Sequence, residues 1–309
     1  MSENRLYYHI VAFVVVAIWG STFVFTKLLL QSGLTPAQIF TLRFTIAYVL
    51  LLCYSLITQH SSLFASSWRD ELLMVALGIT GGSVYFLTEN AAMLYTTATN
   101  TSLIVCSCPL FAMLLVAIVY RHTERITKMQ ALGSVVACLG MAIVVLNGHF
   151  VLHLSPLGDL LAFAACLCWA VYSLLAKPAT ERYSSIFVTR KVFFYGLLTI
   201  IPYYILNPSE ITLFTIRYSL FTLPVILNLL FLGVVASMLC YLVWNWVISK
   251  LGAVVATNWV YFNPVTTIIF AWWLLNEQIT PWFILGTVLI LSGMYLCSRT
   301  STTSGQISL

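Results

Sequence analysis

The chain has 309 residues, of which 61% are hydrophobic and 7% are charged, and its mean hydropathy is +0.98. Soluble domains carry about 25% charged residues, so this composition excludes a water-soluble globular protein and predicts an all-α integral membrane protein. The net charge of +5 is spread thinly, which argues against nucleic acid as a partner and leaves the lipid bilayer. The eight cysteines fall in apolar runs and indicate neither disulfides, nor a metal site, nor a cofactor.

Ten membrane spans are predicted from the apolar runs between proline, glycine and charged residues. A spanning helix needs about 20 mostly apolar residues, and the runs cover 9–29, 36–57, 72–94, 98–120, 128–146, 156–177, 184–205, 222–248, 253–275 and 281–298. The first run has no signal-peptide cleavage site, so we expect it to be retained as a span.

The basic residues predict the orientation, since an even number of spans places both ends on one face. Only Lys27 and Arg217 fall in the segments that would lie outside if the termini are cytoplasmic. The inside segments then contain Arg5, Arg69, Arg121, Arg125, Lys128, Lys177, Arg182, Lys250 and Arg299. We therefore expect cytoplasmic termini, a disordered tail over 299–309, and contacts of Arg190 and Lys191 with cytoplasmic headgroups.

The two halves of the chain are similar at nearly constant offsets. Matched pairs are Gly78 and Gly233, Asn90 and Asn245, Gly133 and Gly286, Gly140 and Gly293, Trp19 and Trp169, and Lys27 and Lys177. We expect two five-helix repeats, 9–146 and 156–298, with 299–309 as a tail. Because five is odd, the second repeat is inverted, which is typical of secondary transporters with a midplane substrate site. A channel or a scaffold also fits a duplication.

Small residues recur on one face of the predicted fifth span. Gly133, Ala137 and Gly140 lie at helical spacing, and Gly286 and Gly293 repeat the glycine pair. Such a stripe indicates either a dimerisation seam or close helix packing within one chain. We favour packing within one chain, and an oligomer is not required.

One sequence pattern occurs in both repeats. After Leu42-Arg43-Phe44, the first repeat has Tyr95-Thr96-Thr97-Ala98…Pro109…Glu124-Arg125-Ile126-Thr127…Gly133…Gly140, and the second has Leu251-Gly252-Ala253…Pro264…Glu277-Gln278-Ile279-Thr280…Gly286…Gly293. The pattern resembles the drug/metabolite transporter (DMT) superfamily, EamA type, from about Val11 to Cys297. This resemblance implies ten helices in two inverted five-helix repeats, cytoplasmic termini, and export of amino acids, other metabolites or organic cations from bacteria.

Two charged residues lie well inside the predicted spans, where polar groups are costly and mark functional sites by default. Arg43 suits either a substrate carboxylate or the backbone carbonyls of a helix end. Glu89 shares a helix face with Tyr85 at i, i+4 spacing. It suits proton coupling, pairing with a cationic substrate, or the place of an interfacial carboxylate in water.

Neutral polar and aromatic residues gather on matched helices of both repeats. Together they suit a pocket for a modest-sized organic molecule. Each one alone suits equally a helix–helix hydrogen bond worth about 0.6–2 kcal/mol. With the two charges, the predicted cavity residues are Trp19, Thr22, Arg43, Tyr85, Glu89, Asn100, Thr101, Trp169, Tyr172, Tyr241, Asn245, Asn258 and Tyr261.

The sequence offers no motif for an intramembrane enzyme or an ATPase. All five histidines fall at helix ends or in loops, and there is no G-x-x-x-x-G-K-[ST] loop. We predict a secondary transporter of the bacterial inner membrane that exports a small molecule, an amino acid or related metabolite, by alternating access. The alternatives are an exporter of organic cations or drugs, and a receptor or channel-like protein. Protons are the candidate coupling ion, and the substrate stays open.

Overall fold

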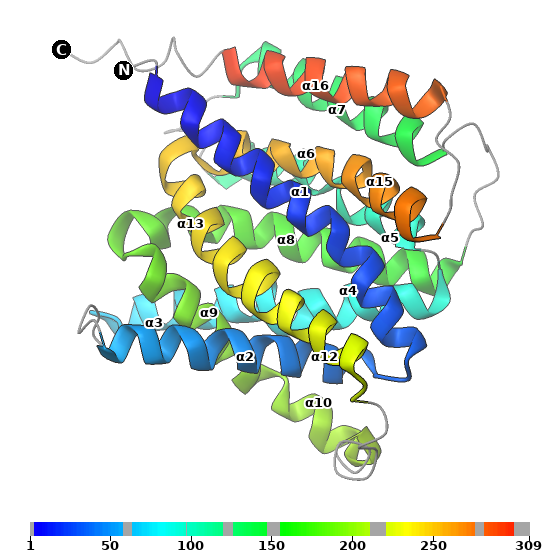
Figure 1. Cartoon of the computed structure of the whole chain (residues 1–309). Helices are drawn as coiled ribbons and strands as arrows, with labels where there is room; N and C mark the ends of the chain where they lie inside the picture. The colour runs from blue at the N-terminus through cyan, green and yellow to red at the C-terminus, as the bar shows by residue number, and fades with distance from the viewer. Residues whose placement is uncertain are drawn as a thin grey trace.

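The computed structural model describes residues 3–57, 64–96, 98–119, 126–146, 155–210, 221–275 and 281–299. Every regular element in these ranges is a helix, as the composition predicts, and Figure 1 shows them packed into one bundle. In chain order they are α1 (Glu3–Gln31), α2 (Pro36–Ile57), α3 (Trp68–Gly78), η1 (Ile79–Ser83), α4 (Val84–Tyr95), α5 (Ala98–Val105), α6 (Cys108–Val119), α7 (Lys128–Leu146), α8 (Pro156–Arg182), α9 (Ser185–Thr199), α10 (Ile201–Leu206), α12 (Leu223–Leu230), η3 (Phe231–Leu239), α13 (Cys240–Leu251), α14 (Ala253–Asn258), η4 (Trp259–Phe262), α15 (Asn263–Leu275) and α16 (Pro281–Arg299).

Seven helices in the described part of the chain are long and apolar enough to cross a membrane. They are Leu6–Gln31, Pro36–Ile57, Trp68–Tyr95, Pro156–Arg182, Ser185–Leu206, Leu223–Leu251 and Ala253–Leu274, with shorter apolar helices at Cys108–Val119, Lys128–Ile143 and Ile284–Gly293. The protein is therefore a multi-pass, all-helical membrane protein. The count of ten spans and the cytoplasmic termini stay predictions. In Figure 1, α1 begins and α16 ends at the left of the view.

Helices α3 and α8 extend beyond their predicted spans. Helix α3 begins four residues before the expected start at 72, because the Ser67 side chain caps it by accepting a hydrogen bond from the backbone N–H of Asp70 at 3.1 Å. Helix α8 continues past Pro178 to Arg182, although an internal proline removes one helical hydrogen bond. The Thr180 hydroxyl donates to the carbonyl of Ala176 at 2.8 Å just beside the proline. Both extensions place charged residues at one end of the bundle.

π-Helical turns interrupt the matched spans of the two halves. The turn η1 covers 79–83, and the turn η3 covers 231–239, which includes the positions 155 residues further along the chain. π-Turns are rare and occur mostly at functional sites, because they shift backbone carbonyls out of the α-helical pattern. The same irregularity therefore occurs at repeat-related positions in both halves.

The two glycine pairs pack α7 against α16, and Figure 1 shows these helices lying together at the top of the bundle. A Cβ on Gly140 would lie 2.7 Å from the carbonyl oxygen of Gly286, and a Cβ on Gly293 would lie 2.4 Å from that of Gly133. Glycine is thus needed for the close approach of the two backbones. The small-residue face packs within one chain, as favoured, rather than being free for a dimer.

Large apolar side chains cover the outside of the bundle. Ile118, Leu160, Trp273 and Ile284 are each more than 60% exposed. A water-facing surface rarely carries extended apolar patches, whereas lipid tails solvate them without cost. Aromatic rings and small residues fill the interior, with Phe40, Phe44, Phe193 and Trp244 fully buried.

Candidate substrate-binding cavity

A cavity lies among helices of both halves of the chain. Its empty space, including its open mouth, is about 430 Å³. The first half supplies residues from α1, α2, α4, α5 and α6, and the second from α8, α13, η4 and α15. The lining residues are Trp19, Thr22, Phe23, Arg43, Tyr85, Phe86, Glu89, Val105, Cys108, Trp169, Tyr241, Val260 and Asn263.

More than half of the predicted site residues meet at this cavity. Those that line it are Trp19, Thr22, Arg43, Tyr85, Glu89, Trp169 and Tyr241. They come from α1, α2, α4, α8 and α13, and they include both intramembrane charges. These five helices, which come from both repeats, therefore meet at one space.

Other predicted residues bond helices together instead of lining the cavity. The Tyr172 hydroxyl donates to the Asn245 carboxamide oxygen at 2.7 Å, and the Asn245 amide donates to the Thr189 hydroxyl at 2.9 Å. These bonds join α8, α13 and α9. They are the helix–helix hydrogen bonds that were the alternative for each single polar residue.

The remaining predicted residues also lie away from the cavity lining. The Asn258 carboxamide oxygen accepts a hydrogen bond from Ser134 at 3.1 Å, which connects α14 with α7. Thr101 and Tyr261 are fully buried in the packing between helices. The side chain of Asn100 is outside the described part of the structure.

Arg43 lies at the cavity with one side-chain bond. Its Nε donates to the Ser237 hydroxyl at 2.9 Å, and its guanidinium carbon lies 4.3 Å from the centroid of the Phe86 ring. Within the described residues, its terminal nitrogens donate no hydrogen bond, and it does not bind the carbonyls of a helix end. The side chain is 2% exposed, so the guanidinium is held in place with most of its donors unused.

Glu89 brings the opposite charge to the same cavity. Its Oε1 accepts a hydrogen bond from the Tyr85 hydroxyl at 2.7 Å, one helical turn away, as the spacing predicts. The side chain is 8% exposed, which excludes the interpretation as a water-exposed interfacial carboxylate. Among the ion pairs of the described residues there is none between Arg43 and Glu89, so the two charges face one cavity without contact within 4.0 Å.

Aromatic rings form much of the rest of the wall. The ring centroids of Trp19 and Trp169 are 5.3 Å apart, and the ring centroid of Tyr241 lies 5.6 Å from that of Trp19 and 5.8 Å from that of Trp169. The Tyr85 ring lies 5.1 Å from Trp169. Contacting rings at these separations stabilise one another beyond their buried area, so they form a rigid wall.

The two π-turns hold two of these rings in equivalent ways. The Tyr241 hydroxyl donates to the carbonyl of Gly81 in η1 at 2.6 Å, and the Trp19 indole N–H donates to the carbonyl of Ala236 in η3 at 2.8 Å. Gly81 and Ala236 are 155 residues apart, the offset of the repeats. Each half therefore offers a backbone carbonyl of its π-turn to an aromatic side chain that lines the cavity.

Six residues that line the cavity were not among the predicted site residues. The additional lining residues are Phe23, Phe86, Val105, Cys108, Val260 and Asn263. Phe86 was identifiable, because it lies 155 residues before Tyr241 and so occupies the matching position in the first repeat. The aliphatic residues carry no sequence signal that separates them from ordinary packing residues.

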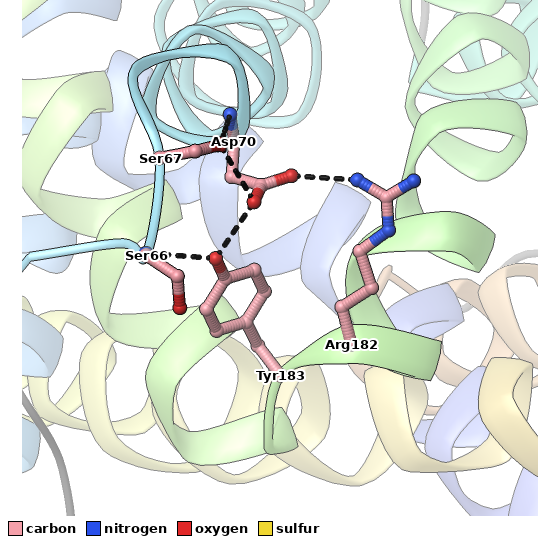
Figure 2. A network of polar contacts seen from close by, with 5 residues as sticks. All are labelled: Ser66, Ser67, Asp70, Arg182 and Tyr183. Atoms are coloured by element: carbon pink, nitrogen blue, oxygen red, sulfur yellow. Dashed lines mark hydrogen bonds and ion pairs between the residues drawn. The ribbon is translucent and has the colours of Figure 1, made fainter.

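A polar network joins the two halves at one end of the bundle. Figure 2 shows Asp70, at the start of α3, between Ser67 and the pair Arg182 and Tyr183, the last residue of α8 and the residue that follows it. Its carboxylate accepts from Arg182 at 2.7 Å and from the Tyr183 hydroxyl at 2.9 Å, and Tyr183 in turn accepts from the backbone N–H of Ser66 at 2.9 Å. These contacts bridge the first and the second repeat.

A second bridge lies directly beside the first. Glu71 forms an ion pair with Lys191 and accepts a hydrogen bond from the Tyr195 hydroxyl, both on α9. The side chain of Lys191 is 5% exposed, and Arg190 is buried too. The prediction that Arg190 and Lys191 contact lipid headgroups is therefore wrong. A carboxylate that the extended α3 brings to α9 pairs with the lysine instead.

A third network bridges the halves between the start of α2 and the segment that follows α10. It lies beyond the end of the Ser185–Leu206 helix, whereas Lys191 lies near the start of that helix. The Glu210 carboxylate, beyond α10, accepts from the Thr35 hydroxyl at 2.6 Å and from the Tyr203 hydroxyl at 2.7 Å. The Gln38 side chain donates to the Glu210 backbone carbonyl at 3.1 Å. The start of α2 is thus bonded to the segment that follows α10.

Similar proteins that match about three quarters or more of the chain carry transporter names. The chain is 25% identical over 292 residues to an uncharacterized transporter of Archaeoglobus fulgidus, covering 93% of this chain and 96% of that protein. It is 26% identical over 294 residues to a probable amino-acid metabolite efflux pump of Escherichia coli, covering 93% of each. A probable terminal-alkyne amino-acid exporter of Streptantibioticus cattleyicolor is 26% identical over 233 residues, covering 75% of this chain and 74% of that protein.

A structural superposition and a family match agree with the transporter names of these relatives. A solved crystal structure superposes with a TM-score of 0.71 at 17% identity, over 97% of this chain and 98% of the other, which shows a shared fold. Residues 6–146 and 156–299 each match the EamA-like transporter family. The resemblance to the DMT superfamily is thereby confirmed, and the chain belongs to the EamA-like transporter family.

Proposed function

We propose that this protein is a secondary transporter of the bacterial inner membrane that exports amino acids or related small metabolites by alternating access. The observation that carries the proposal is the cavity itself. It is lined by both halves of a duplicated chain, contains one buried arginine and one buried glutamate, and has aromatic rings over much of its wall. Such a space binds a small organic molecule with polar ends and an apolar body.

The polar bridges support alternating access. Asp70 and Glu71 bond the first half to the second at one end, and Glu210 bonds them through the opposite helix ends. Two repeats that rock against each other around a central site must open one end while the other stays closed. Bonds between the repeats at both ends are the contacts that such rocking would break in turn.

The named functions of relatives favour amino acids as the substrate class. The similar proteins of Escherichia coli and Streptantibioticus cattleyicolor are called a probable amino-acid metabolite efflux pump and a probable amino-acid exporter. The cavity suits this class, because an amino acid carries a carboxylate and an ammonium group. Residues 1–309 contain no motif for ATP hydrolysis, so we expect transport driven by gradients.

Flux into reconstituted vesicles tests the proposal. Purified protein in proteoliposomes should accelerate the movement of at least one labelled amino acid or related metabolite from a panel that also includes nucleobases and organic cations. A Trp169→Ala variant, which removes a cavity wall, should reduce that flux, whereas Trp273→Ala on the lipid-facing surface should not. Absence of flux for the whole panel contradicts the proposal.

Export of organic cations is the second candidate function. It is favoured by Glu89 among aromatic rings, since aromatic faces attract cations. The buried guanidinium of Arg43 argues against it, because a cation in the same cavity would meet a like charge. The panel separates the two candidates: flux of cations but not of amino acids would establish the second.

A further inference from the structure

We propose that the cavity recognises its substrate as a zwitterion, with Arg43 binding a carboxylate and Glu89 binding an ammonium group of the same molecule. The inference rests on the proposed function and deepens it by assigning the two poles of the site. It also specifies the substrate class: an α-amino acid whose side chain is uncharged and apolar or aromatic. The contacts of the two charged residues carry the argument.

Arg43 is arranged as a receptor for an anion. The bond from its Nε to Ser237 and the contact with the Phe86 ring fix the plane of the guanidinium. Within the described residues the terminal nitrogens have no acceptor, and the side chain lines the cavity. A guanidinium with two parallel free donors matches a carboxylate in a bidentate pair.

Glu89 is arranged as a receptor for a cation. The Tyr85 hydroxyl binds Oε1 and fixes the carboxylate, while Oε2 accepts no hydrogen bond from the described part of the chain. An ammonium group is a compact donor of three hydrogen bonds and suits a single free oxygen flanked by rings.

The two charges are complementary to a zwitterion rather than to a single ion. Arg43 and Glu89 are the charged residues among those that line the cavity, and they make no direct ion pair there. A molecule with one charge would leave the other buried group without a partner, which is expensive in a low-dielectric site. A zwitterion satisfies both and keeps the cavity neutral.

The remaining wall specifies the body of the substrate. It consists mainly of Trp19, Phe86, Trp169, Tyr241 and Val260, which favour an apolar or aromatic group. Two further polar atoms there lack a partner within the described residues, the indole N–H of Trp169 and the carboxamide oxygen of Asn263.

Three probes that differ only in charge test the assignment. Binding of phenylalanine, of phenethylamine (no carboxylate) and of 3-phenylpropionate (no ammonium) is measured on the full-length protein in lipid nanodiscs. The wild-type protein should bind phenylalanine at least about tenfold tighter than either analogue, since a charged hydrogen bond is worth that much. Similar affinities for all three, or no binding of any, would overturn the zwitterion assignment.

Variants assign the poles individually. Arg43→Gln should weaken phenylalanine about tenfold and leave phenethylamine unchanged or tighter, and Glu89→Gln should weaken phenylalanine and leave phenylpropionate unchanged or tighter. Arg43→Lys keeps the charge, so it should retain the order of the three probes. The matched control is Arg190→Gln, another buried arginine that does not line the cavity, and it should leave the order intact.

Two results separate this inference from the proposed function. If Arg43→Gln lowers the affinity for phenethylamine as much as the affinity for phenylalanine, the arginine does not bind the carboxylate and the assignment fails. If in addition proteoliposomes still move phenethylamine, the protein remains a transporter with a different substrate class. If proteoliposomes move no compound of the whole panel, the proposed function fails.

Discussion

Glu89 and Tyr85 are one helical turn apart in α4, and their hydrogen bond follows from that spacing alone. The bond between Arg43 and Ser237 has no such local origin, because it joins residues that are 194 positions apart. Both charges were identifiable in the sequence as costly groups inside spans. Their convergence on one cavity was only an expectation, since it depends on how distant helices pack.

At Glu89, we predict that binding of an amino acid weakens as the pH falls. Protonation removes the charge that attracts the ammonium group, so the affinity for phenylalanine should fall as the pH is lowered. The other charged or titratable residues of the cavity are Arg43, Tyr85, Cys108 and Tyr241. Measured in nanodiscs, Glu89→Gln should bind weakly throughout and show no such dependence.

A control and a contrary result define this experiment. Glu181→Gln removes an exposed carboxylate at the end of α8, outside the cavity, and should keep the wild-type pH profile. An unchanged profile in Glu89→Gln would remove this residue from the pH response. It would also end its candidacy as the site of proton coupling.

The second prediction at the residue scale concerns the hydrogen bond of the Tyr241 hydroxyl. Tyr241→Phe removes the hydroxyl that donates to the Gly81 carbonyl, so this buried acceptor in the π-turn loses its side-chain partner. We expect a loss of about 1–3 kcal/mol of stability, measured as a lower melting temperature in detergent. Tyr7→Phe, on an exposed side chain, should leave the melting temperature unchanged; an equal loss in both would contradict the role of this bond.

At the scale of elements, apolar runs predict helices well and irregular turns poorly. The second span was expected over 36–57, and α2 covers Pro36–Ile57. The π-turns η1 and η3 were not predicted, because their carbonyls are stabilised by Tyr241 and Trp19 from other helices. The early start of α3 depended on the cap from Ser67, a serine in a polar stretch with several candidate caps.

The prediction at the scale of elements concerns the close contact between α7 and α16. Gly140→Ala would bring a Cβ to 2.7 Å from the Gly286 carbonyl oxygen, so the helices must separate. Overpacking of this kind costs about 1–3 kcal/mol, and we expect a lower melting temperature. Val135→Ile adds the same single carbon on the exposed face of α7 and should have little effect. Equal melting temperatures for both variants would show that the contact is looser than the structure has it.

For the whole molecule, the duplication predicted two halves around a central space, and the cavity is lined by both. The bridges that close this arrangement were not predicted. Asp70 and Glu71 lay outside the expected third span, and their partners Arg182 and Lys191 are more than 100 residues away. Pairing across repeats depends on the rotation of each helix, which neither the period nor the offset of the repeats determines.

These bridges predict opposite effects at the two ends of the molecule. Asp70→Asn weakens the contact with Arg182 and Tyr183, and Glu210→Gln weakens the contact with Thr35 and Tyr203. If the halves rock between two states, each substitution should favour opening of its own end. The Arg182 side chain is 62% exposed, so water weakens its ion pair and we expect a shift in population of a few-fold at most, rather than unfolding.

A cysteine introduced into the cavity can report this shift in population between the two open states. With the eight native cysteines replaced and Thr22→Cys introduced, an impermeant thiol reagent labels the cavity from whichever side is open. The predicted orientation places Asp70 at the cytoplasmic end, so Asp70→Asn should increase labelling from the cytoplasmic side and decrease it from outside, and Glu210→Gln should do the reverse. Because the same cavity residue reports both variants, a shift of both in one direction would mean that the two networks do not act on one rocking equilibrium. Opposite shifts of similar size would instead show that the two bridges are alternately closed contacts of the same motion.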